Sequence, residues 1–108
     1  MTQMQRKPAS PGDILLYEFM EPYALKINDL AEILNVHRNS VSALVNNNRK
    51  LTTDMAFRLA KAFDTSADFW LNLQSNLDIW EVNNDPRIQQ EHARVQAVSA
   101  FLAKRSAA

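Results

Sequence analysis

The sequence contains no cysteine, a single glycine and no long apolar run. Without cysteine the chain can form neither disulfides nor thiolate metal sites, and we expect it to reside in a reducing compartment, the cytoplasm. No stretch approaches the ~18 apolar residues of a membrane span, and no apolar block follows the start. We therefore expect no membrane anchor and no signal peptide.

Sequence motifs of enzymes are also missing. There is no glycine-rich phosphate loop, no nucleophile elbow and no carboxylate pair at a catalytic spacing. His92 has no HExxH or other metal-ligand spacing around it, and we interpret it as a surface residue. We therefore expect a binding protein with no enzymatic activity, no metal and no cofactor.

The composition, rich in Ala, Leu and Asn, favours an all-α protein, and 108 residues suit one domain. We expect a flexible tail over residues 1–9, a helical domain over 10–84 and a helical arm over 85–108. Arg6 and Lys7 in the tail could alternatively enter a DNA minor groove or contact a protein partner.

The most informative stretch spans residues 27–46. Its first half repeats apolar residues at the i, i+3, i+4 and i+7 positions of a helix, namely Ile27, Leu30, Ala31 and Leu34. Asn35 tolerates the left-handed backbone of a sharp turn, with Val36 at the corner. A second helix over residues 38–46 buries one face, made of Val41, Leu44 and Val45. Two short helices joined by a tight turn predict a helix-turn-helix.

The opposite face of the second helix carries only polar side chains, Arg38, Asn39, Ser42 and Asn46, within about a 100° arc. Arginine pairs with guanine in the major groove, asparagine with adenine, and serine with either. A solvated helix face would carry similar residues. The buried pattern beneath it favours DNA reading, so we predict that these four side chains contact bases.

Contacts to the sugar-phosphate backbone are expected around this helix. Lys26 and Asn28 begin the first helix, and Asn47, Arg49 and Lys50 lie in the loop after the second. A plain turn would also use asparagines here, because they tolerate positive φ.

Charge is balanced overall, with 12 basic and 12 acidic residues, but it is unevenly distributed. Basic residues cluster near the proposed recognition helix, and acidic residues gather later, at Asp64, Asp68, Asp78, Glu81 and Asp85. This pattern predicts a basic DNA-reading end, and the acidic half could bind a basic protein.

The remaining helices are predicted from caps and apolar periodicity. We expect a first helix over residues 11–20, capped by Ser10 and ended by Pro22. Thr52 should cap a helix from which Arg58 and Lys61 face outward, with an Asp54–Arg58 pair. A helix over 67–82 should begin at Ser66, with Phe69 or Trp70 closing the core. Asp85 should cap a last helix over 86–104.

The last third of the chain carries more apolar residues than the core of a small domain needs. We predict that part of this set lies at a dimer interface, namely Leu77, Ile79, Trp80, Val95, Val98 and Leu102. The alternatives are that the first three pack on the first helix, and that the arm packs on the helix over 67–82.

Three blocks of this sequence resemble the HigA-type antitoxins of the XRE/Cro–repressor helix-turn-helix family, over about residues 8–77. The first block reads PGDIL…EF…EP (residues 11–22), and the second has LA..L.V.RN.VS (30–42). The third is T.DMA.RLAKA..TS..FWLNLQ, over residues 52–74. Three positions differ from the family pattern, since Asn35 replaces a turn glycine, His37 a serine cap, and Asn47 or Asn48 a loop glycine.

The resemblance implies a lambda-repressor-like five-helix helix-turn-helix domain with an extra C-terminal helix. It also implies a dimeric antitoxin that binds double-stranded operator DNA, represses its own operon and neutralises a co-encoded HigB-like mRNA endonuclease toxin. By position it places base contacts on the four residues named above, and adds His37 to the backbone contacts. Two other hypotheses stay open, an orphan regulator without a toxin and a protein-binding scaffold.

Overall fold

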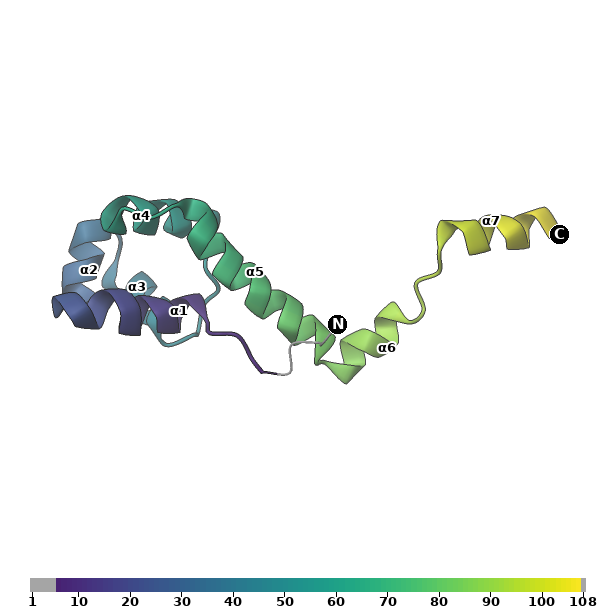
Figure 1. Cartoon of the computed structure of the whole chain (residues 1–108), viewed down its shortest axis with the longest axis horizontal. Helices are drawn as coiled ribbons and strands as arrows, with labels where there is room; N and C mark the ends of the chain where they lie inside the picture. Colours follow the sequence, from purple (N-terminus) through teal and green to yellow (C-terminus); the bar gives the residue numbers. More distant parts are fainter. Residues whose placement is uncertain (1–5, 108) are drawn as a thin grey trace.

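The computed structural model describes residues 6–107, and within this range all regular structure is helical. The helices α1 to α5, with η1 and η2 between α1 and α2, build a rounded domain, and α6 and α7 extend from it as an arm (Figure 1). This confirms the all-α prediction. The elements are α1 (Pro11–Ile14), η1 (Leu15–Met20), η2 (Glu21–Tyr23), α2 (Ile27–Leu34), α3 (Arg38–Val45), α4 (Thr53–Phe63), α5 (Ala67–Asn83), α6 (Pro86–His92) and α7 (Val98–Ala107).

Side-chain caps fix the starts of four helices, as the sequence predicts. Each capping oxygen accepts a hydrogen bond from a backbone N–H of the first turn, which satisfies a donor that the helix leaves free. The caps are Ser10 on Asp13 N (3.0 Å), Thr52 on Met55 N (3.2 Å), Ser66 on Phe69 N (3.0 Å) and Asp85 on Arg87 N (2.9 Å).

The first helix departs from the prediction, because Pro22 does not end it. α1 runs directly into a π-helical turn, η1, in which Glu21 N–H bonds to Leu16 O, five residues back. η2 then places Pro22 in the first turn of a 3₁₀ helix, where no proline N–H is needed. The helical backbone ends instead at Ala24, whose φ is 55°.

A core of apolar side chains joins α1 to α5, with Trp70 at its centre. Trp70 is fully buried, which confirms that it closes the core, whereas Phe69 stays 39% exposed at the edge. The Phe19 ring lies 5.0 Å from the rings of both Phe63 and Trp70. The predicted apolar faces of α2 and α3 are buried in this core except for Ile27, which is half-buried beside it, as is Val36.

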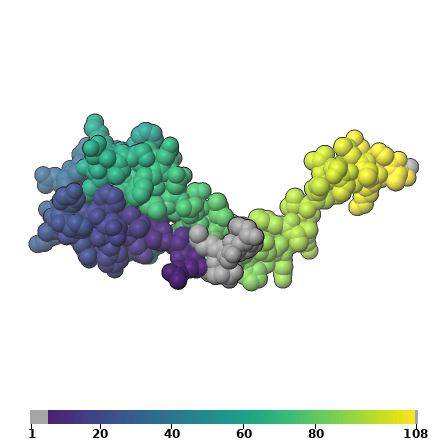
Figure 2. Space-filling view, viewed as in Figure 1, coloured from purple at the N-terminus to yellow at the C-terminus, as the bar shows by residue number. Residues whose placement is uncertain are grey.

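The arm holds two short helices, so the prediction of one helix over residues 86–104 was wrong. The chain leaves helical geometry after Ala93, where Arg94 and Val95 make tight i→i−3 bonds to Glu91 and His92. No side chain of α6 or α7 is buried, so no packing stabilises one continuous helix. The structure measures 66 × 26 × 24 Å, and Figure 2 shows the arm extending away from the domain.

The described helices are all too short or too polar to cross a lipid bilayer.

Candidate nucleic-acid interface

The turn between α2 and α3 has the geometry that the sequence predicts. Asn35 is left-handed, with φ 56° and ψ 51°, and its N–H bonds to Glu32 O at 3.2 Å. Val36 N–H then bonds to Ala31 O at 3.0 Å, which closes the helix end. This turn fixes the crossing of α3 over α2.

Arg58 on α4 also holds this turn, contrary to the expectation that it faces solvent. Its Nη1 donates to Leu34 O at 2.8 Å and to Asn35 O at 3.3 Å, while Nε bonds the predicted partner Asp54 at 2.8 Å. A guanidinium at the C-terminal end of α2 satisfies free carbonyls and opposes the negative end of the helix dipole. The sequence does not predict this role of Arg58, because the contact joins residues more than 20 positions apart.

His37 caps the start of α3 with a ring nitrogen. Its Nδ1 accepts a hydrogen bond from Asn39 N–H at 3.1 Å, so the capping ring has an unprotonated Nδ1. His37 therefore replaces the serine cap of related sequences with a different acceptor at the same place. The side chain is exposed beside α3, which is compatible with its predicted contact to a DNA phosphate.

The underside of α3 is apolar and its outer face is polar, as predicted. Val41, Leu44 and Val45 are buried. The four predicted base-contacting side chains lie at the surface, with Arg38, Asn39 and Asn46 exposed and Ser42 half-buried. Asn46 caps the C-terminal end of α3 directly after Val45, and its Nδ2 lies 3.3 Å from Ser42 Oγ. The structure therefore brings the four together on one accessible face.

Arg38 is held by a residue that was predicted to contact the DNA backbone. Its Nε donates to Asn28 Oδ1 at 2.8 Å, which bridges the first turn of α3 to the first turn of α2. This bond uses the Nε–H group of the guanidinium and leaves the hydrogens on Nη1 and Nη2 for other acceptors. Lys26 precedes α2 with an exposed side chain, and its backbone N–H bonds to Asp29 Oδ2 at 2.9 Å.

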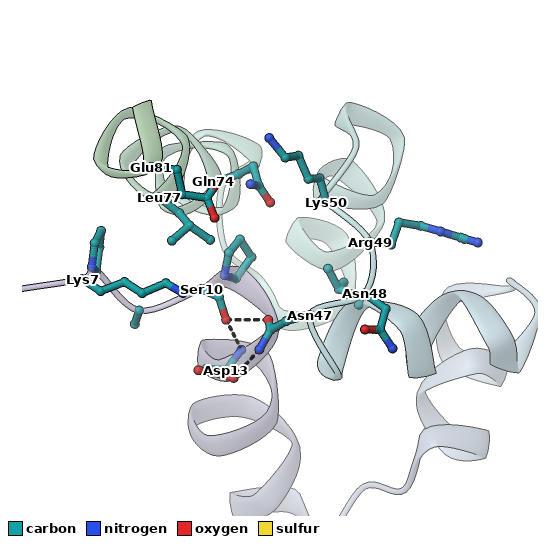
Figure 3. A pocket seen from close by; sticks show the side chains of 15 residues that line it. Lys7, Ser10, Asp13, Asn47, Asn48, Arg49, Lys50, Gln74, Leu77 and Glu81 are labelled. Atoms are coloured by element: carbon teal, nitrogen blue, oxygen red, sulfur yellow. Dashed lines mark hydrogen bonds between the residues drawn. The ribbon is translucent and has the colours of Figure 1, made fainter. Parts of the chain in front are cut away.

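Asn47, the first residue of the loop after α3, joins this loop to the start of α1. Its φ is 61°, its Oδ1 accepts from Ser10 Oγ at 2.7 Å, and its Nδ2 donates to Asp13 Oδ1 at 3.1 Å. Figure 3 shows this group at the edge of a cavity of about 480 Å³. The Asn47 side chain thus has an internal structural role, and its contact with DNA stays a prediction.

Gly12 is what allows α1 to approach α3 so closely. A Cβ on Gly12 would lie 2.1 Å from Leu44 O and 2.8 Å from Asn47 Oδ1. The only glycine of the chain is therefore required by packing, since its backbone conformation is an ordinary helical one. The sequence shows the glycine but not its partner, Leu44.

The two basic residues of the loop after α3, Lys50 and Arg49, differ in the contacts that hold their side chains. Lys50 Nζ lies 3.0 Å from Asp78 Oδ1 on α5, and this hydrogen bond raises the pKa of Lys50 above its ordinary value. Gln74, which is buried, accepts from Leu51 N–H at 2.9 Å and donates to Asp78 at 2.9 Å. Arg49 is exposed, with Nη1 3.5 Å from Ser40 Oγ. The loop that follows α3 is therefore fastened to α5, a role for Gln74 that sequence reasoning missed.

The six residues predicted at a dimer interface fall into two separate groups. Leu77, Ile79 and Trp80 lie on α5, where Ile79 is 56% exposed and the other two are half-buried. The other three, Val95, Val98 and Leu102, are exposed on the arm. Trp80 Nε1 is buried without a hydrogen-bond acceptor in the described part of the chain, and Lys7 Nζ lies 5.8 Å from its ring centroid.

Comparison with known proteins identifies the family of this structure. The helix-turn-helix family HTH_3 matches residues 16–70, which include α2, α3 and α4. An HTH-type transcriptional regulator of Escherichia coli (strain K12), YbaQ, is 67% identical over 105 residues, covering 97% of this chain and 93% of the relative. Antitoxin HigA-1 of Vibrio cholerae is 42% identical over 102 residues, covering 94% of each chain.

A solved structure supports the same assignment. The Pseudomonas aeruginosa antitoxin HigA, determined with the higBA promoter, superimposes with a TM-score of 0.75 at 36% identity. The match covers 84% of this chain and 98% of the HigA chain. With its five-helix domain, its asparagine turn and its exposed polar face on α3, this chain belongs to the HigA-type antitoxins of the XRE-like helix-turn-helix family.

Proposed function

We propose that this chain is a dimeric repressor that reads the operator of its own operon with α3 and neutralises a co-encoded HigB-like mRNA endonuclease. One observation carries the DNA-binding part, the row of four polar side chains on α3 above a buried apolar face. A helix fixed from below presents its side chains to the major groove in one orientation.

Each side chain of this row suits a base edge. Arg38 Nη1 and Nη2 form the fork that pairs with guanine O6 and N7, because Nε is already bonded to Asn28. Asn39 and Asn46 match the donor and acceptor of adenine, and Ser42 matches either base. Asn28 limits the motion of Arg38, so less side-chain entropy is lost when the guanidinium binds.

The backbone contacts come from the exposed residues that flank the row. Lys26, His37 and Arg49 lie at the surface beside α3 and supply donors to phosphates. Lys50 supplies another when it exchanges Asp78 for a phosphate oxygen. Asn28 and Asn47 donate to phosphates through the side-chain amide hydrogens that are not used in their bonds to Arg38 and Asp13.

The antitoxin part of the proposal is supported by the relatives. A protein 42% identical over nearly the whole chain is named Antitoxin HigA-1, and the P. aeruginosa structure contains an antitoxin HigA with its promoter. An orphan regulator without a toxin is the second candidate. It is compatible with the 67% identical E. coli relative, which is named an uncharacterized HTH-type transcriptional regulator.

Two measurements test these parts separately. Fluorescence anisotropy with a duplex from upstream of its own gene should show saturable binding that competitor DNA of unrelated sequence does not displace. Equal displacement by unrelated DNA would contradict operator reading. A tagged chain expressed in its own host should recover a small protein encoded next to its gene. Recovery of none, with operator binding intact, would favour the orphan regulator.

A further inference from the structure

The start of α3 depends on a side chain that can change its charge. His37 Nδ1 lies 3.1 Å from the backbone nitrogen of Asn39 and accepts its hydrogen bond. A neutral imidazole carries one proton, so this proton must be on Nε2 while Nδ1 acts as an acceptor. A serine hydroxyl caps a helix at any pH in the physiological range, whereas His37 caps α3 only as one tautomer of its neutral form.

The other nitrogen of the His37 ring is free to bind a partner. Nε2 makes no hydrogen bond to the residues that the structure describes, and the side chain is exposed beside α3. Its N–H is therefore available to a phosphate oxygen while Nδ1 still accepts from Asn39. The neutral ring can thus join the first turn of α3 to the DNA backbone.

A proton added to His37 Nδ1 would break this arrangement at the helix. The new Nδ1–H would face the Asn39 N–H, so the cap is lost and that donor has no protein acceptor. The positive charge would also lie at the positive end of the α3 dipole. Arg38 and Asn39 are the first two residues of α3, so the loss of order falls on two of the side chains that we propose read bases.

The charged groups of the neighbouring helices offer a protonated His37 no ion pair. The charged side chains of the three helices around this turn are Asp29 and Glu32 on α2, Arg38 on α3, and Asp54, Arg58 and Lys61 on α4. Within residues 6–107 none of these carboxylates forms a salt bridge or a hydrogen bond with the His37 ring, and Asp54 is paired with Arg58. Only a phosphate would therefore stabilise the new charge.

We propose that His37 makes base reading by α3 sensitive to pH. The neutral ring orders the first turn of the helix, and the protonated ring releases that turn while it still contacts a phosphate. His37 is then a positioning residue for Arg38 and Asn39. This inference rests on the proposed function, because it concerns the same face of α3. Protonation should weaken the discrimination between operator and unrelated DNA, and it should not weaken the phosphate contacts that both duplexes share.

The ratio of operator affinity to affinity for unrelated duplex tests this coupling when it is measured at about pH 7.5 and about pH 5.5. Histidine is the side chain that ordinarily changes charge in this interval, and the chain has two, His37 and His92. At one ionic strength, the ratio should fall roughly fivefold at the lower pH, as expected for one lost N-cap.

Two variants separate His37 from other titrating groups. His37→Ser keeps a capping oxygen at both pH values, so its ratio should stay constant. His92→Ser changes the histidine on α6 and should show the same pH dependence as wild type. A wild-type ratio that stays constant, or an equal fall in His37→Ser, would overturn the proposal alone. No operator preference even at the higher pH would overturn the proposed function and this inference with it.

The tautomer of His37 can be tested without DNA. A long-range nitrogen–proton correlation spectrum of the histidine-labelled protein should show an unprotonated Nδ1 and a protonated Nε2 when the ring is neutral. The Asn39 amide resonance should move as the ring is titrated, and the same resonance in His37→Ser should not. The opposite tautomer, or an Asn39 amide that does not respond to the titration, would overturn the proposal.

Discussion

Asn28 Oδ1 accepts a 2.8 Å hydrogen bond from Arg38 Nε, so the first turn of α2 holds the first of the side chains that we propose read bases from α3. The two residues are ten positions apart, and the turn at Asn35 brings them together. Asn28 is therefore a positioning residue for Arg38 as well as a candidate phosphate contact.

Replacing Asn28 with alanine should weaken operator binding without unfolding the protein. The loss of one hydrogen bond to a charged group at an exposed site should cost about 1 kcal/mol, or roughly a fivefold rise in Kd. Anisotropy titrations of the Asn28→Ala variant give this value, and thermal unfolding should show an unchanged Tm. In the Asn28→Ala/Arg38→Ala double variant, the Asn28 effect should shrink, whereas full additivity would contradict the positioning role.

Removing the Asp78 carboxylate should lower the pKa of Lys50 toward its ordinary value, as an NMR titration of Nζ would show. Because the folded pKa of Lys50 is raised, this pair stabilises the fold below about pH 10.4 for as long as the carboxylate is ionised, and the stabilisation is lost as pH rises through the folded pKa. The stability difference between wild type and Asp78→Asn should therefore become smaller at strongly alkaline pH, where only the Gln74 bond to Asp78 still distinguishes the two proteins.

The same substitution should strengthen the dependence of DNA binding on salt. When Lys50 is not paired with Asp78, no carboxylate neutralises its charge as it approaches the DNA phosphates. The slope of log K against log salt should therefore become more negative by up to about 0.9. Glu81→Gln removes a nearby acid that does not hydrogen-bond Lys50 and serves as the control. Identical slopes for Asp78→Asn and wild type would contradict the idea that Asp78 limits the contact of Lys50 with the phosphates.

Substitution of Gly12 by alanine should destabilise the protein, because the new Cβ would overlap the backbone oxygen of Leu44. Overpacking against backbone typically costs about 1–3 kcal/mol. Urea unfolding should show a lower midpoint with an unchanged m-value, and α1 should lose its bonds to Asn47. Wild-type stability in Gly12→Ala would contradict the close contact of α1 with α3.

Asn35 should tolerate glycine and reject a β-branched residue. A left-handed φ of 56° costs an ordinary side chain about 1–2 kcal/mol, so Asn35→Val should lower the free energy of unfolding by that amount. Asn35→Gly, the matched control, should stay within about 1 kcal/mol of wild type. Equal stability of the two variants would mean that the turn relaxes to another conformation.

The features that the sequence predicts correctly depend on neighbours within one or two helical turns. Caps such as Ser10 and Thr52, the left-handed turn at Asn35 and the buried stripe of α2 all follow from residues at most seven positions apart. The polar face of α3 could be predicted for the same reason.

What sequence reasoning missed depends on contacts between distant parts of the chain. Gly12 is constrained by Leu44, Arg58 by the end of α2, and Gln74 by the backbone of Leu51. The break in the arm was missed because an apolar periodicity predicts a continuous helix only where a packing surface exists. The end of the first helix was also predicted wrongly. A proline usually ends an α-helix, but here the backbone changes to a 3₁₀ helix whose first turn contains Pro22.

The ratio of operator affinity to affinity for unrelated duplex, measured for Arg38→Ala and Arg49→Ala, tests the central claim most directly. If Arg38 reads a base, Arg38→Ala should lower the ratio roughly 5- to 150-fold, in line with about 1–3 kcal/mol of base discrimination. Arg49→Ala should weaken binding to both duplexes equally and leave the ratio unchanged. A ratio that Arg38→Ala does not alter would contradict base reading by α3.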